Sequence, residues 1–499
     1  MSMDMKAELT DPSPVMATMA NHTVEKIGGT SITATDTVLR NVLIGGRSGD
    51  ALYRRIFVVS AYAGITNLLL EHKKTGEPGV YATFINDGTG DEWGGALERL
   101  KSAMLERNAT IFTPGPSRHQ ADAFVAERVE GVRQCLDDLH RLRSHGHFRL
   151  AEPLAAVREM LAGLGEAHSA HNTALLLRDK GINGCFVDLT GWRDTAQPDL
   201  DTRIRDGLAG IDLSTSLPIV TGYAQCKEGM VGRYDRGYSE MTFSRAAVLT
   251  GAAEAIIHKE FHLSSADPKQ VGEANARKIG LTNYDVADQL ANLGMEAIHP
   301  RAGRGLRQAG IWLRVKNTFD PADDGTLIRG DYVSDRPRVE IVTGLRNGTA
   351  LEFFEQDMVG EKGYDAGILE ALTRHRAWII AKSSNANTIT HYLRASGTAV
   401  RRVVEDLEKR FPTAGIATHA VSVVSVIGSD LNRPGLLADA LGALAQAGIS
   451  VMGVQHQIRN VDVQFILARD DFDRAVKALH DRLIGTADST PMPAPAIAA

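Results

Sequence analysis

Short β-branched runs alternate with long helical stretches between Thr23 and Asn317, and this alternation limits the folds open to the chain. Parallel strands need long crossover connections, which are usually helices, so the pattern is typical of an α/β domain with a mostly parallel sheet. The expected strands are Val24 to Ile27, Ile56 to Ser60, Cys185 to Leu189, Pro218 to Thr221, Ala255 to Lys259 and Ile311 to Asn317.

The segment from about Gln120 to Ser144 shows the helical pattern most clearly. Its apolar residues recur at three- and four-residue intervals, which places them on one helix face: Val125, Val129, Val132, Leu136 and Leu139. Further helices are expected from about Ala151 to Lys180 and after Thr282, a residue that can cap a helix. We interpret the stripe as core packing against the sheet and not as a cofactor site.

The composition excludes several functional classes. With 499 residues the chain is too long for one ordinary core, and 23% charged residues are typical of a folded protein. The formal charge of −6 comes without a basic run, so nucleic acid is not an expected partner. Apolar runs such as Ile56 to Val59 are far shorter than the roughly 20 residues of a membrane helix, so no membrane span is expected.

The start of the chain and its cysteines bear on its compartment. The first residues have neither a basic start nor an apolar core, so a cytoplasmic protein is expected. Cys135, Cys185 and Cys226 form no CxxC pattern, and we expect three buried thiols instead of disulfides or a zinc site. His168 and His171 have no carboxylate pair nearby, so hydrogen bonding is expected there and no metal site.

After about Gly330 the sequence contains a weak internal repeat. Segments 361–380 and 433–452 each have a turn glycine, a helix of Ile, Leu and Ala and a β-branched run, and a strand precedes each. Such units predict two small α+β sandwiches, at 336–410 and 415–484, although a chance match of two similar helices is the alternative. The aperiodic ends, 1–21 and 485–499, are expected to be disordered.

Two strand-to-helix turns contain small residues. In the first, Lys26 is followed by Gly28, Gly29 and Ser31, and a helix is expected from about Thr35 to Leu43. Glycine N–H groups and a lysine suit a phosphate, although a structural turn is equally compatible with the pattern. In the second turn, Ser60, Gly64 and Thr66 follow a strand, where Thr66 could also be an ordinary helix cap. Both turns should lie at one sheet edge, where ligands of open α/β sheets bind.

Three later segments contain polar groups that could bind a ligand. Glu166 follows a glycine in a helix of small residues, and it could equally be a solvated helix charge. Arg236 and Ser239 precede an Ala-rich helix, where Arg236 offers a planar fork to a carboxylate or pairs in a surface turn. A strand ends at His258-Lys259, ahead of a turn at 267–269, and this end could hold a nucleotide or only terminate the strand.

Taken in order, these segments resemble the aspartate kinases of the amino-acid-kinase superfamily. That family reads Lys-Phe-Gly-Gly-Thr-Ser, Ser-Ala-x-Ala-Gly-x-Thr-Asn, Gly-Glu, Gly-Arg-Gly-Gly-Ser-Asp, Thr-Asp with Thr-Asp-Pro-Arg, and His-Pro. The corresponding segments here are Lys26 to Ser31, Ser60 to Asn67, Gly165-Glu166, Asp235 to Glu240, His258 to Lys269, and His299-Pro300. The segments DRGYSE, IIHKEFHLSSADP and TNYDVADQL are similar to the aspartate kinase associated with ectoine biosynthesis.

The resemblance implies a fold and an activity. The fold is a three-layer αβα sandwich over 22–330, followed by two ferredoxin-like ACT domains that pair edge to edge in a homodimer and can bind an amino-acid effector. The activity is transfer of the γ-phosphoryl of ATP to the side-chain carboxylate of L-aspartate, with Mg²⁺, to give 4-phospho-L-aspartate. That carboxylate has a pKa of about 3.9, so the nucleophile is already ionised and needs no general base.

The resemblance also implies residue roles. Lys26 and Arg236 are the catalytic residues, with Lys26 on the transferring phosphate, Glu166 at the ammonium of aspartate and Arg236 at its α-carboxylate. The remaining aspartate-binding residues are Ser60, Thr66, Ser239 and Glu240. The ATP-binding residues are Lys26, Gly28, Gly29, Ser31, His258, Lys259, Ser264 and Lys269, and no metal ligand is assigned.

The chain departs from the family pattern mainly on the nucleotide side. His258-Lys259 replace Thr-Asp, Ser264 replaces Tyr, Lys269 replaces Arg, and Glu240 replaces Asp. Glu296 replaces a lysine, so one hypothesis is that Lys259 and Glu296 form a swapped charge pair.

Two other functions stay open at this point. The altered nucleotide side allows a homologue that binds an amino acid and only regulates a partner, while intact Lys26, Glu166 and Arg236 favour catalysis. Another amino-acid kinase, acting on glutamate or acetylglutamate, fits the ACT pair and the Arg236 turn less well. The run from Ile379 to Ala381 lacks an acid that would bind the ammonium of lysine, so weak inhibition by lysine is expected.

Overall fold

The computed structural model describes residues 21–73, 75–86, 92–234, 237–295 and 297–485. The chain divides into two compact units, Met1–His262 with Ile298–Leu327 and Leu263–Ala297 with Ile328–Ala499. Among the helices of the described residues, none is both long and apolar enough to cross a membrane.

Six strands form the parallel sheet of the first unit, in the order β3-β4-β2-β1-β5-β7. They are β1 (Thr23–Ile27), β2 (Arg55–Val59), β3 (Gly184–Val187), β4 (Leu217–Thr221), β5 (Glu254–Lys259) and β7 (Trp312–Asn317). Every residue of β2 and β4 is buried, as expected for strands that are covered on both faces. The predicted parallel sheet is therefore confirmed, with its strand bounds shifted by one or two residues.

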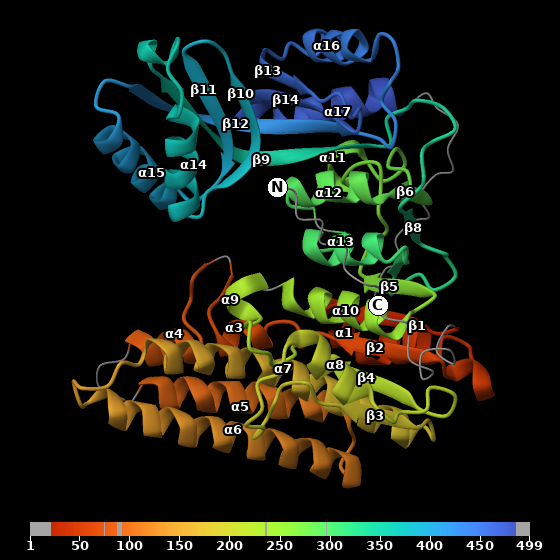
Figure 1. Cartoon of the computed structure of the whole chain (residues 1–499). Coiled ribbons are helices and arrows are strands. Elements are labelled where there is room, and N and C mark those ends of the chain that lie inside the picture. Colours follow the sequence, from red (N-terminus) through yellow and green to blue (C-terminus); the bar gives the residue numbers. More distant parts are fainter. Residues whose placement is uncertain (1–20, 74, 87–91, 235–236, 296, 486–499) are drawn as a thin grey trace, which may run out of the picture. The chain divides into compact units, whose positions relative to one another are not determined.

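Helices cover this sheet on both sides, which gives the three-layer αβα arrangement (Figure 1). The long helices are α5 (Glu92–Ile111), α6 (Pro116–Arg143) and α7 (Ala151–Asp179), and α10 (Tyr238–Thr250) packs on β1, β2 and β5. The apolar stripe of α6 is buried except for Leu139, which is half-buried, so its assignment to the core is confirmed. The predicted helix from Thr35 is split into α2 (Thr35–Val38) and a π-helix, η2 (Leu39–Ile44).

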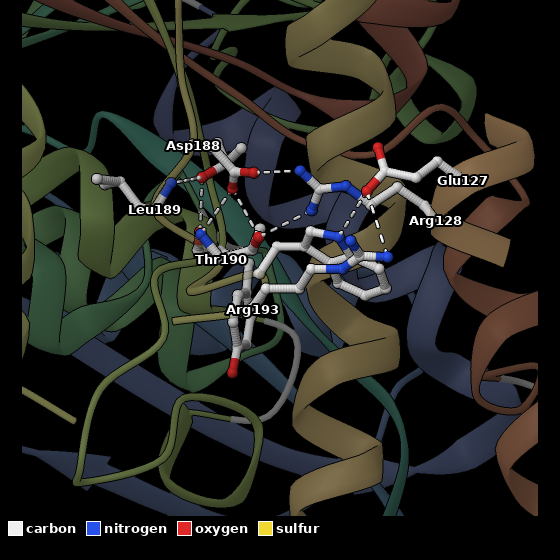
Figure 2. Close-up of polar contacts among 9 residues, drawn as sticks. Glu127, Arg128, Asp188, Leu189, Thr190 and Arg193 are labelled. Atoms are coloured by element: carbon white, nitrogen blue, oxygen red, sulfur yellow. Dashed lines mark hydrogen bonds and ion pairs between the residues drawn. The ribbon is translucent and has the colours of Figure 1, made fainter. Parts of the chain in front are cut away.

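The loop after the edge strand β3 is fixed to α6 by Arg128, which sequence reasoning did not single out. Figure 2 shows its guanidinium beside Asp188 and Thr190, and its Nη2 donates to Asp188 Oδ2 at 2.5 Å. The guanidinium also lies over the ring of Trp192, at 4.6 Å from the centroid. Because these contacts bury the arginine, the loop is held against the helix layer.

The three cysteines are free, but the expectation that all of them are buried is wrong. Cys226 is buried, Cys185 is half-buried, and Cys135 lies on the exposed side of α6. Cys135 lies next to the apolar stripe and not in it, because a helix turns 100° per residue.

The second unit contains a six-stranded antiparallel sheet in the order β10-β11-β9-β12-β14-β13. Its elements are β9 (Ile341–Phe354), α14 (Tyr364–Arg374), β10 (Trp378–Ser384), β11 (Thr388–Arg394), α15 (Gly397–Arg410), β12 (Gly415–Ile427), α16 (Leu436–Gln446), β13 (Val451–His456), β14 (Asp462–Ala468) and α17 (Phe472–Leu483). Both copies of the predicted repeat form a helix followed by a strand, so the α+β pattern is confirmed.

The expected serial boundary between the two sandwiches is wrong. Val339 and Val342, assigned to the first sandwich, pack in the core of the second, whereas Leu351 and Phe353 of the same strand β9 pack in the first. Strand β12 pairs with β9 over both cores, with a register shift between Val421 and Val423. At about 3.3 Å per residue these long strands extend through both cores, so the first sandwich is inserted into the second.

The segment Leu263–Ala297, expected in the catalytic domain, belongs to the second compact unit. Ala266, Val271 and Ala276 pack in the same core as α17. The helix expected after Thr282 is α12 (Tyr284–Asn292), and its cap is Asn283, whose Oδ1 accepts from the N–H of Val286 at 2.9 Å. Thr282 instead donates to Glu340, so the predicted cap is off by one residue.

Candidate active site

The two small-residue turns lie together at the carboxyl edge of the sheet, as predicted. Lys26 of β1 is in register with Val58 of β2, so the turns that follow these strands are neighbours. A Cβ on Gly29 would lie 2.8 Å from the carbonyl oxygen of Ala61 in the second turn, so only glycine allows this approach. Gly28 donates its N–H to the carbonyl oxygen of His258 at 3.4 Å, which joins β5 to the same edge.

Lys26 is buried at this edge and paired with Glu240 of α10. The distance from its Nζ to Glu240 Oε1 is 3.3 Å, and Glu240 Oε2 accepts the N–H of His299. Burial alone would raise the pKa of Glu240, but the charges of Lys26 and Lys259 lower it below its ordinary value. Glu240 was predicted to bind substrate, and in this structure its carboxylate positions Lys26.

Glu166 lies on α7 beside Ser239 of α10. Ser239 Oγ donates to Glu166 Oε1 at 2.6 Å, and Ser60 Oγ is 3.3 Å from Ser239 Oγ. Glu166 is 2% exposed, and its Oε2 has no hydrogen-bond partner among the described residues. Burial raises the pKa of Glu166 to about 8, against the opposing effects of Ser239 and Lys26. The structure thus brings together three residues predicted for the aspartate side.

Gly222, which sequence reasoning missed, shapes the space around Glu166. It follows β4, and a Cβ there would lie 2.8 Å from Glu166 Oε2, Ser239 Cβ and the carbonyl oxygen of Val59. A glycine directly after a predicted strand, at the edge shared by the two turns, was the available signal.

Ser31 and Thr66 follow the two turns. Ser31 is fully buried, and its Oγ has no partner among the described residues, so it is a polar atom left for a ligand. Thr66 lies inside α3 (Ile65–Leu69), and the cap of that helix is Gly64, with a φ of 86°. The alternative in which Thr66 caps the helix is therefore wrong.

The predicted nucleotide residues divide between the two compact units. The side chain of His258 is buried and its Nε2 lies 2.7 Å from Glu25 Oε2, so it is engaged inside the protein. Glu25 and Lys26 are consecutive in a strand, so their side chains point to opposite faces of the sheet. Because the His258 side chain contacts Glu25, it lies on the face opposite to Lys26. Ser264, whose Oγ donates to Ala266, and Lys269 of α11 (Pro268–Val271) belong to the second unit.

Two predicted residues lie outside the described part of the chain. They are Arg236 and Glu296, so the roles assigned to them and the proposed pair of Lys259 with Glu296 stay predictions.

Histidines were considered as possible metal ligands. His168 is buried and hydrogen-bonded as expected, with its Nε2 2.7 Å from Asn108 Oδ1. His171 stacks on Phe124, and its Nδ1 has no hydrogen-bond partner among the described residues. Within the described residues, His262, Asp320 and Asp323 are close enough to share an ion. However, Asp320 lies 3.1 Å from Nε2 and Asp323 3.7 Å from Nδ1, on different ring nitrogens. The two carboxylates therefore lie at different nitrogens of the same imidazole ring.

The geometry therefore offers a buried cation, an unpartnered hydroxyl and a carboxyl group with one free oxygen at one sheet edge. Such a set can bind an anion and an ammonium group side by side.

Known families and structures match this chain over most of its length. A model of the amino acid kinase family matches residues 21–317, and a model of the ACT domain matches residues 424–483. The protein named aspartate kinase Ask_Ect from Stutzerimonas stutzeri (strain A1501) is 50% identical over 463 residues, which are 93% of this chain and 97% of that protein. Aspartokinase 3, chloroplastic, from Arabidopsis thaliana is 23% identical over 93% of this chain and 82% of its own length.

Solved structures agree with the fold. The structure of E. coli aspartokinase III in complex with lysine and aspartate superposes with a TM-score of 0.67 at 20% identity, over 93% of this chain and 99% of that one. The same enzyme in complex with aspartate and ADP gives the same TM-score and coverage.

Proposed function

The chain belongs to the amino acid kinase family and is an aspartate kinase, and from this premise we propose which of its residues perform the reaction. The reaction moves the γ-phosphoryl of ATP to the side-chain carboxylate of L-aspartate and gives 4-phospho-L-aspartate. We assign Lys26 to the transferring phosphoryl group and Glu166 with Ser239 to the amino acid.

The carboxylate of aspartate is ionised at neutral pH, so catalysis depends on position and charge and not on a general base. Lys26 is buried, and its partner Glu240 fixes its ammonium at the sheet edge. There it can offset the charge that develops on the equatorial phosphoryl oxygens. The backbone of Gly28 and Gly29 and the unpartnered Ser31 Oγ line the turn beside it and are assigned to the phosphates.

The free oxygen of Glu166 is the observation on which the aspartate site rests. A buried carboxyl oxygen without a partner is costly unless a ligand satisfies it, and an ammonium group supplies the donor and the charge. Burial holds the pKa of Glu166 at about 8, so ammonium binding should ionise this group. Ser60, Thr66 and Arg236 complete the proposed aspartate site, with Arg236 on the α-carboxylate.

We propose that Mg²⁺ enters with ATP. Mg²⁺ is usually held by phosphate oxygens, several waters and one or two carboxylates. Glu240 forms an ion pair with Lys26, and both of its oxygens are engaged by protein groups. The described residues therefore fit an ion that is carried mainly by the nucleotide. Lys259 is assigned to the nucleotide through its charge next to Glu240. Ser264 and Lys269 keep their predicted nucleotide roles as proposals.

Regulation and pathway are proposed from the relatives. The E. coli enzyme is named in complex with lysine, and ACT domains commonly bind an effector between paired copies, so we propose a homodimer with an amino-acid effector site. The Stutzerimonas relative is named Ask_Ect, which agrees with the ectoine-associated motifs, and we propose that the product supplies ectoine synthesis in the cytoplasm.

The test is formation of aspartyl hydroxamate by the purified protein with MgATP, L-aspartate and hydroxylamine. Hydroxamate should form from L-aspartate and not from L-glutamate, and Lys26→Ala should abolish it. Lys180→Ala is the matched control, because Lys180 is exposed at the end of α7. Hydroxamate formation by Lys26→Ala at the unmodified rate would refute the role of Lys26. Amino-acid binding without turnover in the unmodified protein would favour the regulatory homologue.

A further inference from the structure

A cavity lies on the sheet face opposite to Lys26. It has a volume of about 430 Å³ and is lined by Glu25 of β1, by η2 and by the strands β2, β5 and β7. Since Glu25 and Lys26 point to opposite faces of β1, this cavity is separate from the site at the carboxyl edge. It lies entirely within the first compact unit.

The cavity has an excess of positive charge. Five basic side chains and three acidic ones line it, and two of the basic groups are neutralised by the ion pairs Arg55–Glu25 at 2.7 Å and Arg314–Glu254 at 2.7 Å. The remaining basic groups are Arg47, Arg54 and Lys316, and the one remaining acid is Asp324. Among the described residues, no carboxylate lies within 4 Å of any of these three groups.

The floor of the cavity is rigid. Glu25 accepts from Arg55 Nε at 2.7 Å and lies 2.7 Å from His258 Nε2, and Arg55 also donates to the carbonyl oxygens of Val42 and Leu43 in η2. Burial would raise the pKa of Glu25, but the charge of Arg55 and the His258 hydrogen bond lower it, so Glu25 stays ionised. These contacts fix the floor of the cavity, so its shape does not depend on an occupant.

The walls contain two uncommon backbone features. One is the π-helix η2 itself, a conformation that is rare and frequent at functional sites. The other is Arg54, a non-glycine residue with a φ of 58°, which costs energy unless the surroundings enforce it. The chain thus holds Arg54 in a strained conformation at the cavity mouth. Burial and the like charge of Arg55 also lower the pKa of Arg47, and a bound anion would relieve that repulsion.

We propose that this cavity is a binding site for the phosphate group of a small molecule. Arginine presents a planar fork that matches phosphate oxygens, and three cations that have no carboxylate within 4 Å among the described residues suit a dianion better than a single carboxylate. The volume accommodates a small phosphorylated compound. Glu25 and His258 line the cavity, and each directly precedes a lysine of the proposed active site, Lys26 or Lys259. A molecule bound in the cavity would therefore contact the strands that hold these lysines, so it could act as an effector.

The experiment measures binding of inorganic pyrophosphate by calorimetry at constant ionic strength. It uses Lys26→Ala, so that phosphate binding at the active site is weakened, and adds Arg47→Gln with Lys316→Gln in that background. Each lost charge-assisted hydrogen bond weakens binding by about tenfold or more, so we expect a loss of roughly 100-fold in the triple variant. Arg205→Gln with Lys180→Gln in the same background is the matched control, because both residues are exposed and lie outside the cavity.

Pyrophosphate binding by Lys26→Ala that falls only in the cavity variants would support the proposal. Equal affinity in the cavity and control variants, or no binding by Lys26→Ala, would overturn it. If the Arg47 and Lys316 variants do not fold, Arg54→Asn serves instead, since asparagine tolerates a left-handed backbone and removes only the cation. Loss of kinase activity has no bearing on this readout, so failure here and failure of the proposed function are distinguishable.

Discussion

Glu25 and Glu166 are two carboxyl groups of the same unit, each 2% exposed, and their pKa values shift in opposite directions. Glu25 has Arg55 and His258 as partners, and these keep its pKa low in spite of burial. Glu166 has the hydroxyl of Ser239 and one free oxygen, so burial dominates and its pKa rises to about 8. Burial alone therefore does not identify a functional acid; what matters is whether the protein supplies the partner or leaves that place for a ligand.

The comparison predicts that removing the charge of Glu25 is the most damaging change. Glu25→Gln leaves Arg55 buried and unpaired, so the free energy of unfolding should fall by about 3–5 kcal/mol. Urea denaturation measures this. Glu25→Gln combined with Arg55→Met should recover part of the loss, and a single variant as stable as the unmodified protein would contradict the view that Glu25 is structural.

Glu166→Gln should show the reverse behaviour. Its stability should not fall, because a carboxyl group that forms no ion pair among the described residues is replaced by an isosteric amide. However, kcat/KM for aspartate should fall about 100-fold through loss of the ammonium partner. Steady-state kinetics and urea denaturation of the same preparation test both parts. Unchanged kcat/KM would remove Glu166 from the proposed aspartate site.

Gly222→Ala sharpens the comparison from the side of geometry. The added methyl group would lie 2.8 Å from Glu166 Oε2 and should displace this oxygen, which costs about 1–2 kcal/mol and raises the KM for aspartate roughly tenfold. The KM for ATP should change less. The matched control is Gly94→Ala in α5, because a Cβ there would meet no atom within 4 Å. Gly181→Ala is unsuitable as a control, because Gly181 has a φ of 73°. Equal changes in both KM values would argue against a specific effect on Glu166.

The smallest expected effect is a pH dependence. With a pKa of about 8, Glu166 is mostly protonated at pH 7 and half ionised at pH 8. If aspartate binds the ionised form, its KM should be about fivefold higher at pH 7 than at pH 8. Glu166→Gln should lack this dependence, and its presence in that variant would assign it to another group.

The same two groups should affect stability with opposite signs. The folded pKa of Glu166 is raised, so its contribution is present at low pH and is lost as the pH rises towards 8. The folded pKa of Glu25 is lowered, so its contribution is present above the ordinary pKa of 4.5 and is lost on acidification.

Much of the fold could be predicted because its signals are local. Strand and helix patterns located all six parallel strands of the first unit and the helix with the stripe of Val125 and Val132. The predictions that failed required distant contacts. Strand β9 looked like part of one sandwich, but its length and its pairing with β12 place it in two cores. Residue type alone predicts Thr282 as the helix cap, but the neighbouring Asn283 is an equally suitable residue and is the actual cap.

The site shows the same division. Motif order located Lys26, Ser60, Glu166 and Ser239, and the structure brings these residues to one sheet edge. The pairing of His258 with Glu25 joins residues 233 positions apart and has no local signal, and the place of Gly222 after a strand indicates the sheet edge but not its contact with Glu166.

By itself, the sequence determined which segments are helices and strands, where the small-residue turns lie, and the family. These features depend on the dihedral preferences and the apolar periodicity of residues that are neighbours in the chain. The tertiary structure decided which charges meet. Glu25 lies 30 residues from Arg55 and 233 residues from His258, and only the strand order β2-β1-β5 makes them neighbours. Because the energy of a buried charge depends on its partner, the roles of Glu25 and of the cationic cavity follow from that order. The role of Glu166 follows from the packing that places α7 beside Ser239 of α10.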